Sequence, residues 1–288
     1  MSESNTNTVG IVGAGTMGSG IAELVASVGK GVVLLDIEKN IAEDAVAKIE
    51  KSLGRLARRG KIEKEQVPLI VSRIHPTEDY GDFHGADIVI EAASEDMDLK
   101  KAVFAEIEEN TEQSAIIATN TSTLSVTELA MSTSRSEKVV GIHFFNPAPI
   151  MKLVEVINTA KTSPETLEQT MEFARSLDKY PIMAKDRAGF VVNRILLPMM
   201  NEAIFALDEG IATAAEIDNA MKLGANHPIG PLALADLVGL DVTLSVLNVL
   251  YTEYGDPKFR PAPLLKEMVR AGNLGRKTGK GFFEYGKK

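Results

Sequence analysis

Apolar residues in the first two thirds of the chain form short runs that alternate with segments of helical periodicity. The short runs predict buried strands, and the segments in which apolar residues recur every three or four positions predict helices. Such an alternation is typical of a parallel, doubly wound α/β sheet. We expect strands at residues 8–12, 32–35, 86–93, 115–119, 138–145, 152–157 and 180–184, and helices at 19–28, 41–60 and 97–110.

The pattern changes after residue 184. Residues 185–189 predict a linker, and helices replace the alternation beyond it. Phe190–Leu207 is apolar on nearly every face, which predicts burial on all sides, either within its own domain or against a partner subunit. Pro198 predicts a kink in this helix. Further helices are expected at residues 214–223, 232–251 and 263–271.

The predicted fold class is therefore α/β with two domains. Residues 1–184 are expected to form a Rossmann-type domain with a doubly wound, mostly parallel sheet, and residues 185–288 an all-helical C-terminal domain. Because the helices of this second domain carry few polar faces, we expect a homodimer that forms through it.

The composition is that of an ordinary globular protein. A chain of 288 residues with 44% hydrophobic content can bury a substantial core, and its net charge of -9 argues against nucleic acid as a partner. No apolar run approaches the roughly 20 residues of a membrane span. The polar start, residues 1–7, lacks the features of a secretory signal, so we expect a short disordered leader and a cytoplasmic protein. With no cysteine and four histidines without ligand spacing, no disulfide and no metal site are expected.

A glycine-rich turn, Gly-Ala-Gly-Thr-Met-Gly, follows the first strand and opens the first helix. Gly13 permits a tight turn, Gly15 lets a pyrophosphate approach the backbone, and Gly18 allows close helix–strand packing. The amides of the helix N-terminus then attract the phosphates. The alternative is that the glycines serve only the turn. The predicted phosphate-binding residues are Gly13, Ala14, Gly15, Thr16, Met17 and Gly18.

Asp36 supports the dinucleotide interpretation, because it ends the second strand, where an acid binds the ribose diol of the adenosine. A carboxylate at this position repels a 2′-phosphate. NAD(H) is therefore favoured over NADP(H), although Lys39 keeps NADP(H) as the minority alternative.

Residues 138–157 contain a candidate acid–base pair. Two strands joined by a turn at Asn146–Pro149 bring Glu155 beside His143. A neutral imidazole can take a hydroxyl proton near pH 7, and a carboxylate on its other nitrogen fixes the tautomer. The alternative is structural, with the histidine hydrogen-bonded at a strand end and the glutamate facing solvent.

Several polar residues follow the carboxyl ends of the predicted strands, where ligands gather in doubly wound sheets. Ser122 is one of them, and its hydroxyl either caps a helix or donates to a substrate oxygen. The residues expected to share this cleft are Gly15, Asp36, Glu95, Ser122 and His143.

Residues 48–64 hold seven basic residues against two acidic ones, a local net charge of +5 in an acidic chain. The charge pattern alone supports two interpretations of this segment equally. One is a solvated helix end whose cations are favoured by the helix dipole, and the other is a docking surface for a phosphorylated part of the substrate.

The chain resembles the 3-hydroxyacyl-CoA dehydrogenase family, most closely its short bacterial members that act on 3-hydroxybutyryl-CoA. The resemblance implies that a 3-hydroxyacyl thioester of coenzyme A is oxidised to the 3-keto form and that the hydride passes to NAD. It rests on motifs in order across nearly the whole chain, at residues 13–18, 89–92, 120–122, 143–147, 151–155, 189–194, 221–224 and 277–282.

The resemblance also implies roles for single residues. His143 is the general base, oriented by Glu155, while Ser122 and Asn193 hold the substrate oxygens. Ser52 and Arg59 match coenzyme A contacts, which favours the docking role of the basic helix. A lysine is often found in place of Arg59, so the detail of that contact is in doubt. The positions that match dinucleotide contacts are Glu95, Lys100, Ser122, Asn146 and Lys277.

Two other functions compete with this one. A dehydrogenase of a free hydroxy acid or sugar acid keeps the dinucleotide residues and the His/Glu pair but does not need the basic helix. A non-catalytic dinucleotide-binding protein has no reason to keep His143, Glu155, Ser122 and Asn193 together.

Overall fold

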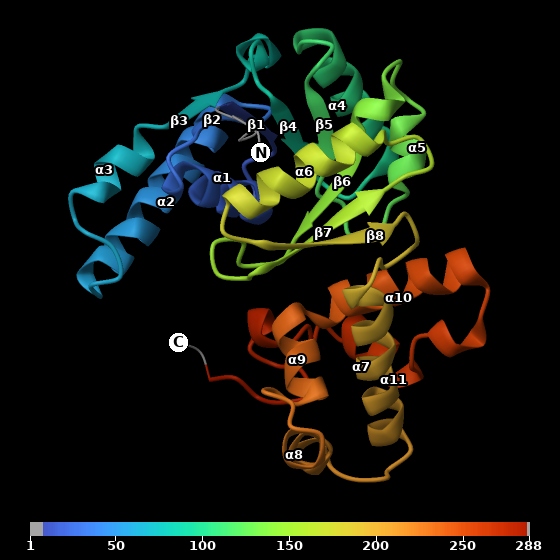
Figure 1. Ribbon diagram of the computed structural model, residues 1–288. Helices are drawn as coiled ribbons and strands as arrows, with labels where there is room; N and C mark the ends of the chain where they lie inside the picture. Colours follow the sequence, from blue (N-terminus) through green and yellow to red (C-terminus); the bar gives the residue numbers. More distant parts are fainter. Residues whose placement is uncertain (1–7, 287–288) are drawn as a thin grey trace. The chain divides into compact units, whose positions relative to one another are not determined.

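The computed structural model describes residues 8–286, so the leader predicted for residues 1–7 lies outside the described residues. The chain divides into two compact units, residues 1–187 and 188–288 (Figure 1). The division falls inside the segment 185–189 that predicts a linker.

The first unit is built on one eight-stranded sheet in the order β3-β2-β1-β4-β5-β6-β7-β8. In this order, each strand from β3 through β2, β1, β4 and β5 to β6 is parallel to its neighbour. Strand β7 is antiparallel to β6, and β8 is parallel to β7. The predicted α/β class and mostly parallel sheet are confirmed. The strands are β1 (Thr8–Val12), β2 (Gly31–Leu35), β3 (Ile74–Thr77), β4 (Ile88–Glu91), β5 (Ile116–Thr119), β6 (Val139–Phe144), β7 (Leu153–Asn158) and β8 (Tyr180–Lys185).

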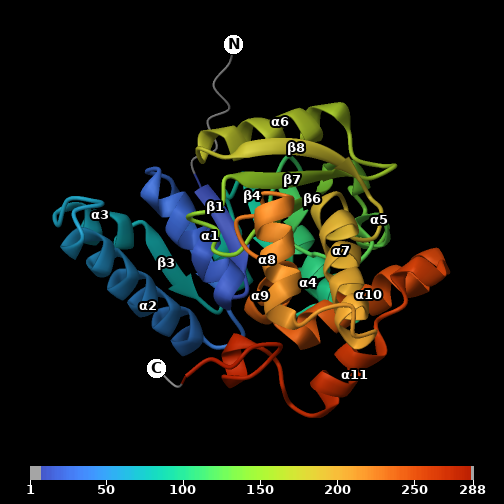
Figure 2. The ribbon, with the colours of Figure 1, turned by 90° about the horizontal axis from the view of Figure 1, so that it is seen from below.

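Helices cover both faces of the sheet. Side chains of α1, α2 and α6 join the buried cluster on one face, and α4 and α5 pack against β4, β5 and β6. Figure 2 shows α2 and α3 beside the edge strand β3. The helices are α1 (Thr16–Ser27), α2 (Lys39–Arg58), α3 (Gln66–Val71), α4 (Met97–Asn110), α5 (Val126–Ala130) and α6 (Pro164–Ser176).

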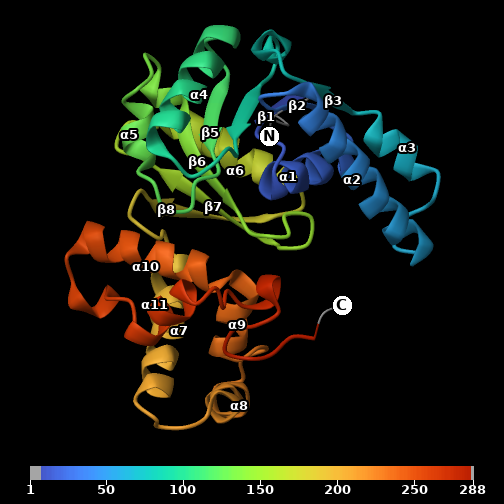
Figure 3. The same ribbon diagram turned by 180° about the vertical axis from the view of Figure 1, so that it is seen from behind.

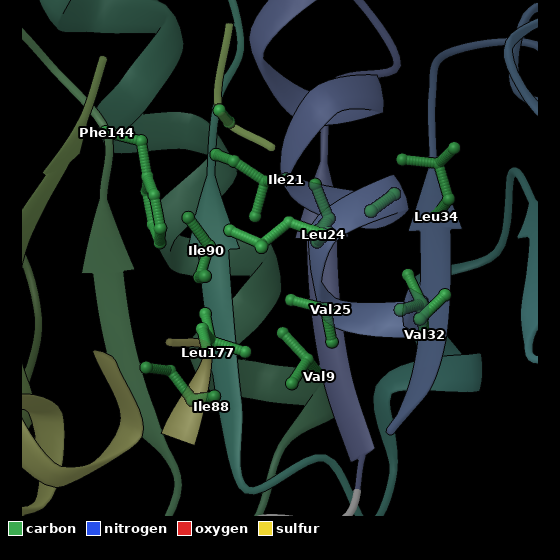
Figure 4. Close-up of a cluster of buried hydrophobic side chains, with 14 of the residues drawn as sticks. Val9, Ile21, Leu24, Val25, Val32, Leu34, Ile88, Ile90, Phe144 and Leu177 are labelled. Atoms are coloured by element: carbon green, nitrogen blue, oxygen red, sulfur yellow. The ribbon is translucent and has the colours of Figure 1, made fainter. Parts of the chain in front are cut away.

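Apolar spacing on α1 explains how this helix fixes the glycine turn to the sheet. Ile21, Leu24 and Val25 lie on one helix face and are buried next to Val9 and Ile90 of the strands (Figure 4). Each fully buried side chain of this size contributes about 1.5–3 kcal/mol. The start of α1 is thus held close to the end of β1.

The register of β6 and β7 places His143 directly opposite Glu155. Residues opposite each other in an antiparallel pair direct their side chains to the same face. Gly141 helps to set this register, because a Cβ there would lie 2.6 Å from Ile157, its partner across the pair. The predicted return of the second strand alongside the first is confirmed.

The second unit is a helical domain, as expected. Figure 3 shows α10 beside α11. Leu197, Met200 and Ile204 of α7 belong to its buried core. The helices are α7 (Val192–Asp208), α8 (Ala214–Gly224), α9 (Pro231–Val238), α10 (Leu240–Tyr254) and α11 (Pro263–Arg270).

One prediction about this unit is wrong. The segment 232–251 is not one helix, because Gly239, with a φ of +103°, separates α9 from α10. The helix at 190–207 is not buried on all sides by its own domain, since Ile195 of α7 is 66% exposed, and burial against a partner subunit stays a prediction. Among residues 8–286 no single helix is long and apolar enough to cross a membrane, and only α9 and α10 together, bent by 97°, match a span in length and composition.

Candidate active site

His143 and Glu155 form a buried pair on β6 and β7. The Nδ1 atom of His143 lies 2.7 Å from Oε2 of Glu155, and the side chains are 6% and 0% exposed. The imidazole also lies against the ring of Phe145, with 4.6 Å between the ring centroids. The predicted pair is therefore present, and its glutamate does not face solvent as the structural alternative required.

Ser122 completes a line of three side chains. Its Oγ lies 3.1 Å from Nε2 of His143, so the two ring nitrogens have different partners. Ser122 does not cap the following helix, because Ser125 occupies that position and accepts a hydrogen bond from the amide of Glu128. The capping interpretation of Ser122 is thus wrong, and its hydroxyl is aimed at the candidate base.

Asn120 is a site residue that the sequence did not single out. Its Oδ1 accepts a hydrogen bond from the amide of Phe144 at 2.9 Å, and the residue is 8% exposed. The bond ties the end of β5 to β6 next to His143. A buried amide that binds backbone in this way fixes the distance between Ser122 and His143.

Glu91, Lys100 and Glu95 form a second ionic group behind the turn that carries Ser122. Lys100 Nζ lies 2.6 Å from Glu91 Oε1 and 3.3 Å from Glu95 Oε2. The sequence pattern did not single out Glu91, because this residue lies at the end of a buried, otherwise apolar strand. A charged residue inside the run Val89-Ile90-Glu91 was the signal that could have identified it.

Glu95 stays ionised in this setting. Burial by itself raises the pKa of Glu95, but the Lys100 charge and hydrogen bonds from the turn outweigh it and lower the pKa below its usual value. The Glu95 side chain is 39% exposed, so it reaches the surface of the cleft while Lys100, at 1%, does not.

The glycine turn has the shape that a dinucleotide needs. Gly13 has a φ of +99°, which side chains disfavour, and a Cβ on Gly18 would lie 1.7 Å from the carbonyl oxygen of Gly13. The backbone geometry of the turn therefore requires glycine at both positions. Gly15 is different, because its φ is -67° and a Cβ there would meet nothing within 4 Å. The open space over Gly15, at the start of α1, fits an approaching pyrophosphate.

Asp36 is bound to the same turn. Its Oδ2 accepts from the amide of Ala14 at 2.7 Å, and its Oδ1 accepts from the amide of Ile37 at 2.8 Å. These bonds fix the carboxylate at the end of β2, beside the first residues of α1. The arrangement fits the ribose of an adenosine, whose hydroxyls can donate to the remaining lone pairs.

The basic helix α2 borders a pocket of about 300 Å³ in the first unit. Ser52 and Lys48 line it from α2, Glu23 lines it from α1, and Asn146 belongs to the turn that closes it. Arg59 lies at the C-terminal end of α2, is exposed, and is not part of the pocket lining.

Glu23 is a further residue that the sequence did not reveal. It is 8% exposed and hydrogen-bonded to Ser52, the predicted coenzyme A contact. Burial raises the pKa of Glu23, and the Ser52 hydrogen bond and the Arg55 charge offset this only in part. The pocket therefore contains an acid as well as the expected cations.

Asn193 and Lys277 belong to the second unit. Asn193 lies in the first turn of α7 and is half-buried. Lys277 Nζ lies 2.5 Å from Asp241 Oδ2, and its side chain is 47% exposed. In residues 8–286 no group of three or more His, Cys, Asp or Glu could hold a metal ion.

Comparisons with known proteins agree over nearly the whole chain. Residues 8–187 match the 3-hydroxyacyl-CoA dehydrogenase NAD binding domain, and residues 189–285 match the 3-hydroxyacyl-CoA dehydrogenase C-terminal domain. The prediction of NAD(H) is thereby confirmed.

Named relatives extend this match. The 3-hydroxybutyryl-CoA dehydrogenase of Clostridioides difficile is 50% identical over 277 residues, which cover 96% of this chain and 99% of the relative. A probable 3-hydroxybutyryl-CoA dehydrogenase of Bacillus subtilis is 45% identical over 278 residues, covering 96% and 97%. The crystal structure of (S)-3-hydroxybutyryl-CoA dehydrogenase from Ralstonia eutropha superimposes with a TM-score of 0.95 at 51% identity, covering 98% of this chain and 100% of that one. The chain belongs to the 3-hydroxyacyl-CoA dehydrogenase family.

Proposed function

We propose that this protein is a dehydrogenase that interconverts (S)-3-hydroxybutyryl-CoA and acetoacetyl-CoA with NAD(H). The observation that carries the proposal is the line Ser122, His143 and Glu155, with distances of 3.1 Å and 2.7 Å between neighbours. The four-carbon acyl group and the S configuration come from the names of the relatives, at 45–51% identity.

His143 exchanges the proton of the reaction at Nε2. In the reductive direction, NADH held at the glycine turn and Asp36 would supply the hydride for C3 of acetoacetyl-CoA. The imidazolium of His143 donates a proton to the oxygen on C3, and the thioester is untouched, so one hydride and one proton are consumed for each alcohol formed. In the oxidative direction the neutral imidazole takes that proton back.

Glu155 and Ser122 prepare His143 for this role. Glu155 accepts the Nδ1–H, which leaves Nε2 for the reacting oxygen and stabilises the imidazolium once it forms. Ser122 can donate its hydroxyl proton to the same oxygen as negative charge develops there. Asn193 is proposed as a second substrate contact, from the resemblance alone.

We propose that NAD(H) binds over Gly15, with its ribose at Asp36. The carboxylate of Asp36 repels a 2′-phosphate and therefore disfavours NADP(H). The further contacts to the dinucleotide proposed by resemblance are Glu95, Lys100, Ser122, Asn146 and Lys277.

The basic helix is proposed as the docking site for the phosphates of coenzyme A. Ser52 lines the pocket beside α2, and Arg59 is exposed at the end of that helix, within reach of bulk solvent. Seven cations between residues 48 and 64 favour a polyanionic ligand such as the coenzyme A phosphates.

A homodimer through the second unit is also proposed. Its support is a set of large apolar side chains that stay exposed in this chain, Ile195 (66%), Ile211 (71%) and Leu223 (86%). Analytical ultracentrifugation tests it, and a monomer at micromolar concentration would contradict it. The cytoplasmic location expected from the sequence stays a prediction.

The reaction is tested by the initial rate of NADH consumption with acetoacetyl-CoA, beside the same assay with NADPH and with acetoacetate. We expect fast consumption of NADH with acetoacetyl-CoA but not with acetoacetate, and little consumption of NADPH. Equal rates with free acetoacetate would favour a hydroxy-acid dehydrogenase. NADH binding without reduction of either substrate would favour a non-catalytic protein.

A further inference from the structure

The loop between β6 and β7, residues 146–151, forms one wall of the pocket beside the basic helix. Five of its six residues line this pocket together with Lys48 and Ser52 of α2. The loop is also packed against the rest of the first unit, since Ala148 is 2% exposed and belongs to the buried cluster. A Cβ on Gly20 of α1 would lie 3.4 Å from the Ala148 Cβ, so the loop lies directly on that helix. The position of the loop therefore sets the width of the pocket.

The loop cannot satisfy all of its own carbonyl oxygens. Pro147 and Pro149 have no N–H group, so two of its six residues donate no backbone hydrogen bond. The amides of Ile150 and Met151 both donate to the carbonyl oxygen of Pro147, each at 3.0 Å. Buried carbonyl groups need a donor, so the other carbonyls of the loop, that of Ala148 above all, require one from elsewhere in the fold.

Lys179, the residue before β8, supplies these donors. Its Nζ donates to the carbonyl oxygens of Ala148 at 2.7 Å, Met151 at 2.8 Å and Pro149 at 3.4 Å. A lysine ammonium carries three donors, and all three acceptors belong to this one loop. The residue is 8% exposed, and burial, together with the charge of Lys152, lowers the pKa of Lys179. The fold thus keeps a cation in a place where burial disfavours its charge and where its hydrogen bonds hold the loop.

We infer that Lys179 is a positioning residue for substrate binding, because it holds the loop 146–151 in place as a wall of the coenzyme A pocket. The inference rests on the proposed function, which places coenzyme A beside Ser52. The reacting groups are held by other contacts, since the register of β6 and β7 sets His143 opposite Glu155. Loosening the loop should therefore weaken binding of the thioester and leave proton transfer nearly intact.

The test compares Lys179→Met with Lys152→Met. The first substitution removes the ammonium and keeps the length of the side chain. Lys152 is the matched control, because it follows the loop directly but pairs with Asp178 at the surface, where its side chain is 69% exposed.

We expect the KM for acetoacetyl-CoA to rise by about tenfold in Lys179→Met, with kcat within about threefold of wild type. Lys152→Met should change neither. A lower kcat of the folded enzyme at an unchanged KM would overturn the inference, because it would show a structural effect on the reacting groups and none on the pocket.

Ile150 shows whether Lys179 acts through the loop. Its side chain lines the pocket and is 71% exposed, so a substrate can reach it. In wild type, Ile150→Ala should raise the KM by about threefold through lost apolar contact. In the Lys179→Met background the same substitution should raise the KM no further, since the loop is no longer held at the pocket. Equal factors in the two backgrounds would contradict the inference.

Lys179→Gln keeps the test open if the methionine variant does not fold. Its amide carries two donors, so it can bind at most two of the three carbonyl oxygens. We expect a smaller rise of the KM, by about threefold, and a KM equal to that of wild type in the folded variant would overturn the inference.

Hydrogen exchange separates this inference from the proposed function. In Lys179→Met the amides of Ile150 and Met151 should exchange about tenfold faster than in wild type, because the loop opens more readily. If the wild-type protein does not reduce acetoacetyl-CoA, the proposed function fails. These exchange rates and the Kd for coenzyme A, measured by calorimetry, still decide the inference. Unchanged exchange or an unchanged Kd in Lys179→Met would overturn it.

Discussion

Buried carboxylates occur in both units, but they have different partners. In the first unit Glu91 and Glu155, both 0% exposed, bind the titratable side chains of Lys100 and His143. In the second unit Asp218 and Asp236, 4% and 1% exposed, bind backbone amides. Burial of an acid is common to both units, so burial alone does not identify the reactive site.

Asp236 shows what the second kind of acid does. It accepts from the amides of Phe282 and Phe283 and from the hydroxyl of Tyr285, each at 3.0 Å. Burial raises the pKa of Asp236, and these hydrogen bonds offset the rise only in part. The residue therefore fastens the C-terminal segment to α9. Burial, and then the hydrogen bond to Asp236 and its charge, raise the pKa of Tyr285, so this hydroxyl stays protonated near neutral pH and does not take a proton from Asp236.

The comparison teaches that the partner of a buried acid indicates its role. Amides are fixed dipoles, and a carboxylate bound to them joins two segments of chain. An imidazole changes its charge, so a carboxylate beside it can support proton transfer. Variants in the two units should accordingly separate catalysis from stability.

The largest effect is expected for His143→Ala in the first unit. Turnover should fall by about 10²-fold or more, since a general acid and base is removed. NADH affinity, measured by fluorescence titration, should stay nearly the same. Near-normal turnover would remove His143 from the mechanism and with it the distinction between the two units.

Asp236→Ala in the second unit should produce the opposite result. Two amides and a hydroxyl lose their acceptor, which should lower the free energy of unfolding by about 1–3 kcal/mol. The kcat of the folded fraction should stay within about twofold, because Asp236 is bound to two amides and to a hydroxyl that stays protonated. Denaturant unfolding beside Asp208→Ala, an exposed acid at the end of α7, provides the control. A fall in kcat without loss of stability would break the comparison.

The smallest effect is expected for Glu23→Gln, an acid whose hydrogen-bond partner is the Ser52 hydroxyl. Burial raises the pKa of Glu23, so the folded protein binds its proton more tightly than the unfolded chain does. Stability from this group is present at low pH and is lost as the pH rises through the folded pKa. Glutamine does not ionise, so Glu23→Gln should have a higher Tm than wild type at pH 8 and no advantage at pH 4. A lower Tm at pH 8, beside the exposed control Glu50→Gln, would show that the Arg55 attraction outweighs burial.

Local sequence was sufficient for the parts of the site that lie on regular strands. A β-branched run and a Pro-containing turn predict the pair β6 and β7, and the pairing then places Glu155 opposite His143. The glycine turn and the position of Asp36 were likewise predictable from residues that are close together in the sequence. The alternation of strands and helices was likewise enough for the sheet.

Contacts that depend on packing were not predictable in this way. Glu91 and Lys100 are separated by nine residues and meet only when α4 packs on the sheet. Glu23 becomes buried only when α1 meets α2. The strand β3 contains His75 and Pro76 and has no apolar alternation, and the break at Gly239 divides an apolar pattern that is continuous in the sequence. Such features depend on tertiary contacts that no local window contains.

The central claim is that Glu155 and His143 work as one acid–base unit. The measurement that tests it most directly is the pH profile of kcat for acetoacetyl-CoA reduction in wild type and in Glu155→Gln. The carboxylate orients the imidazole that donates the proton, so we expect a lower kcat in Glu155→Gln and a profile that does not coincide with that of wild type. Coincident profiles would contradict the claim.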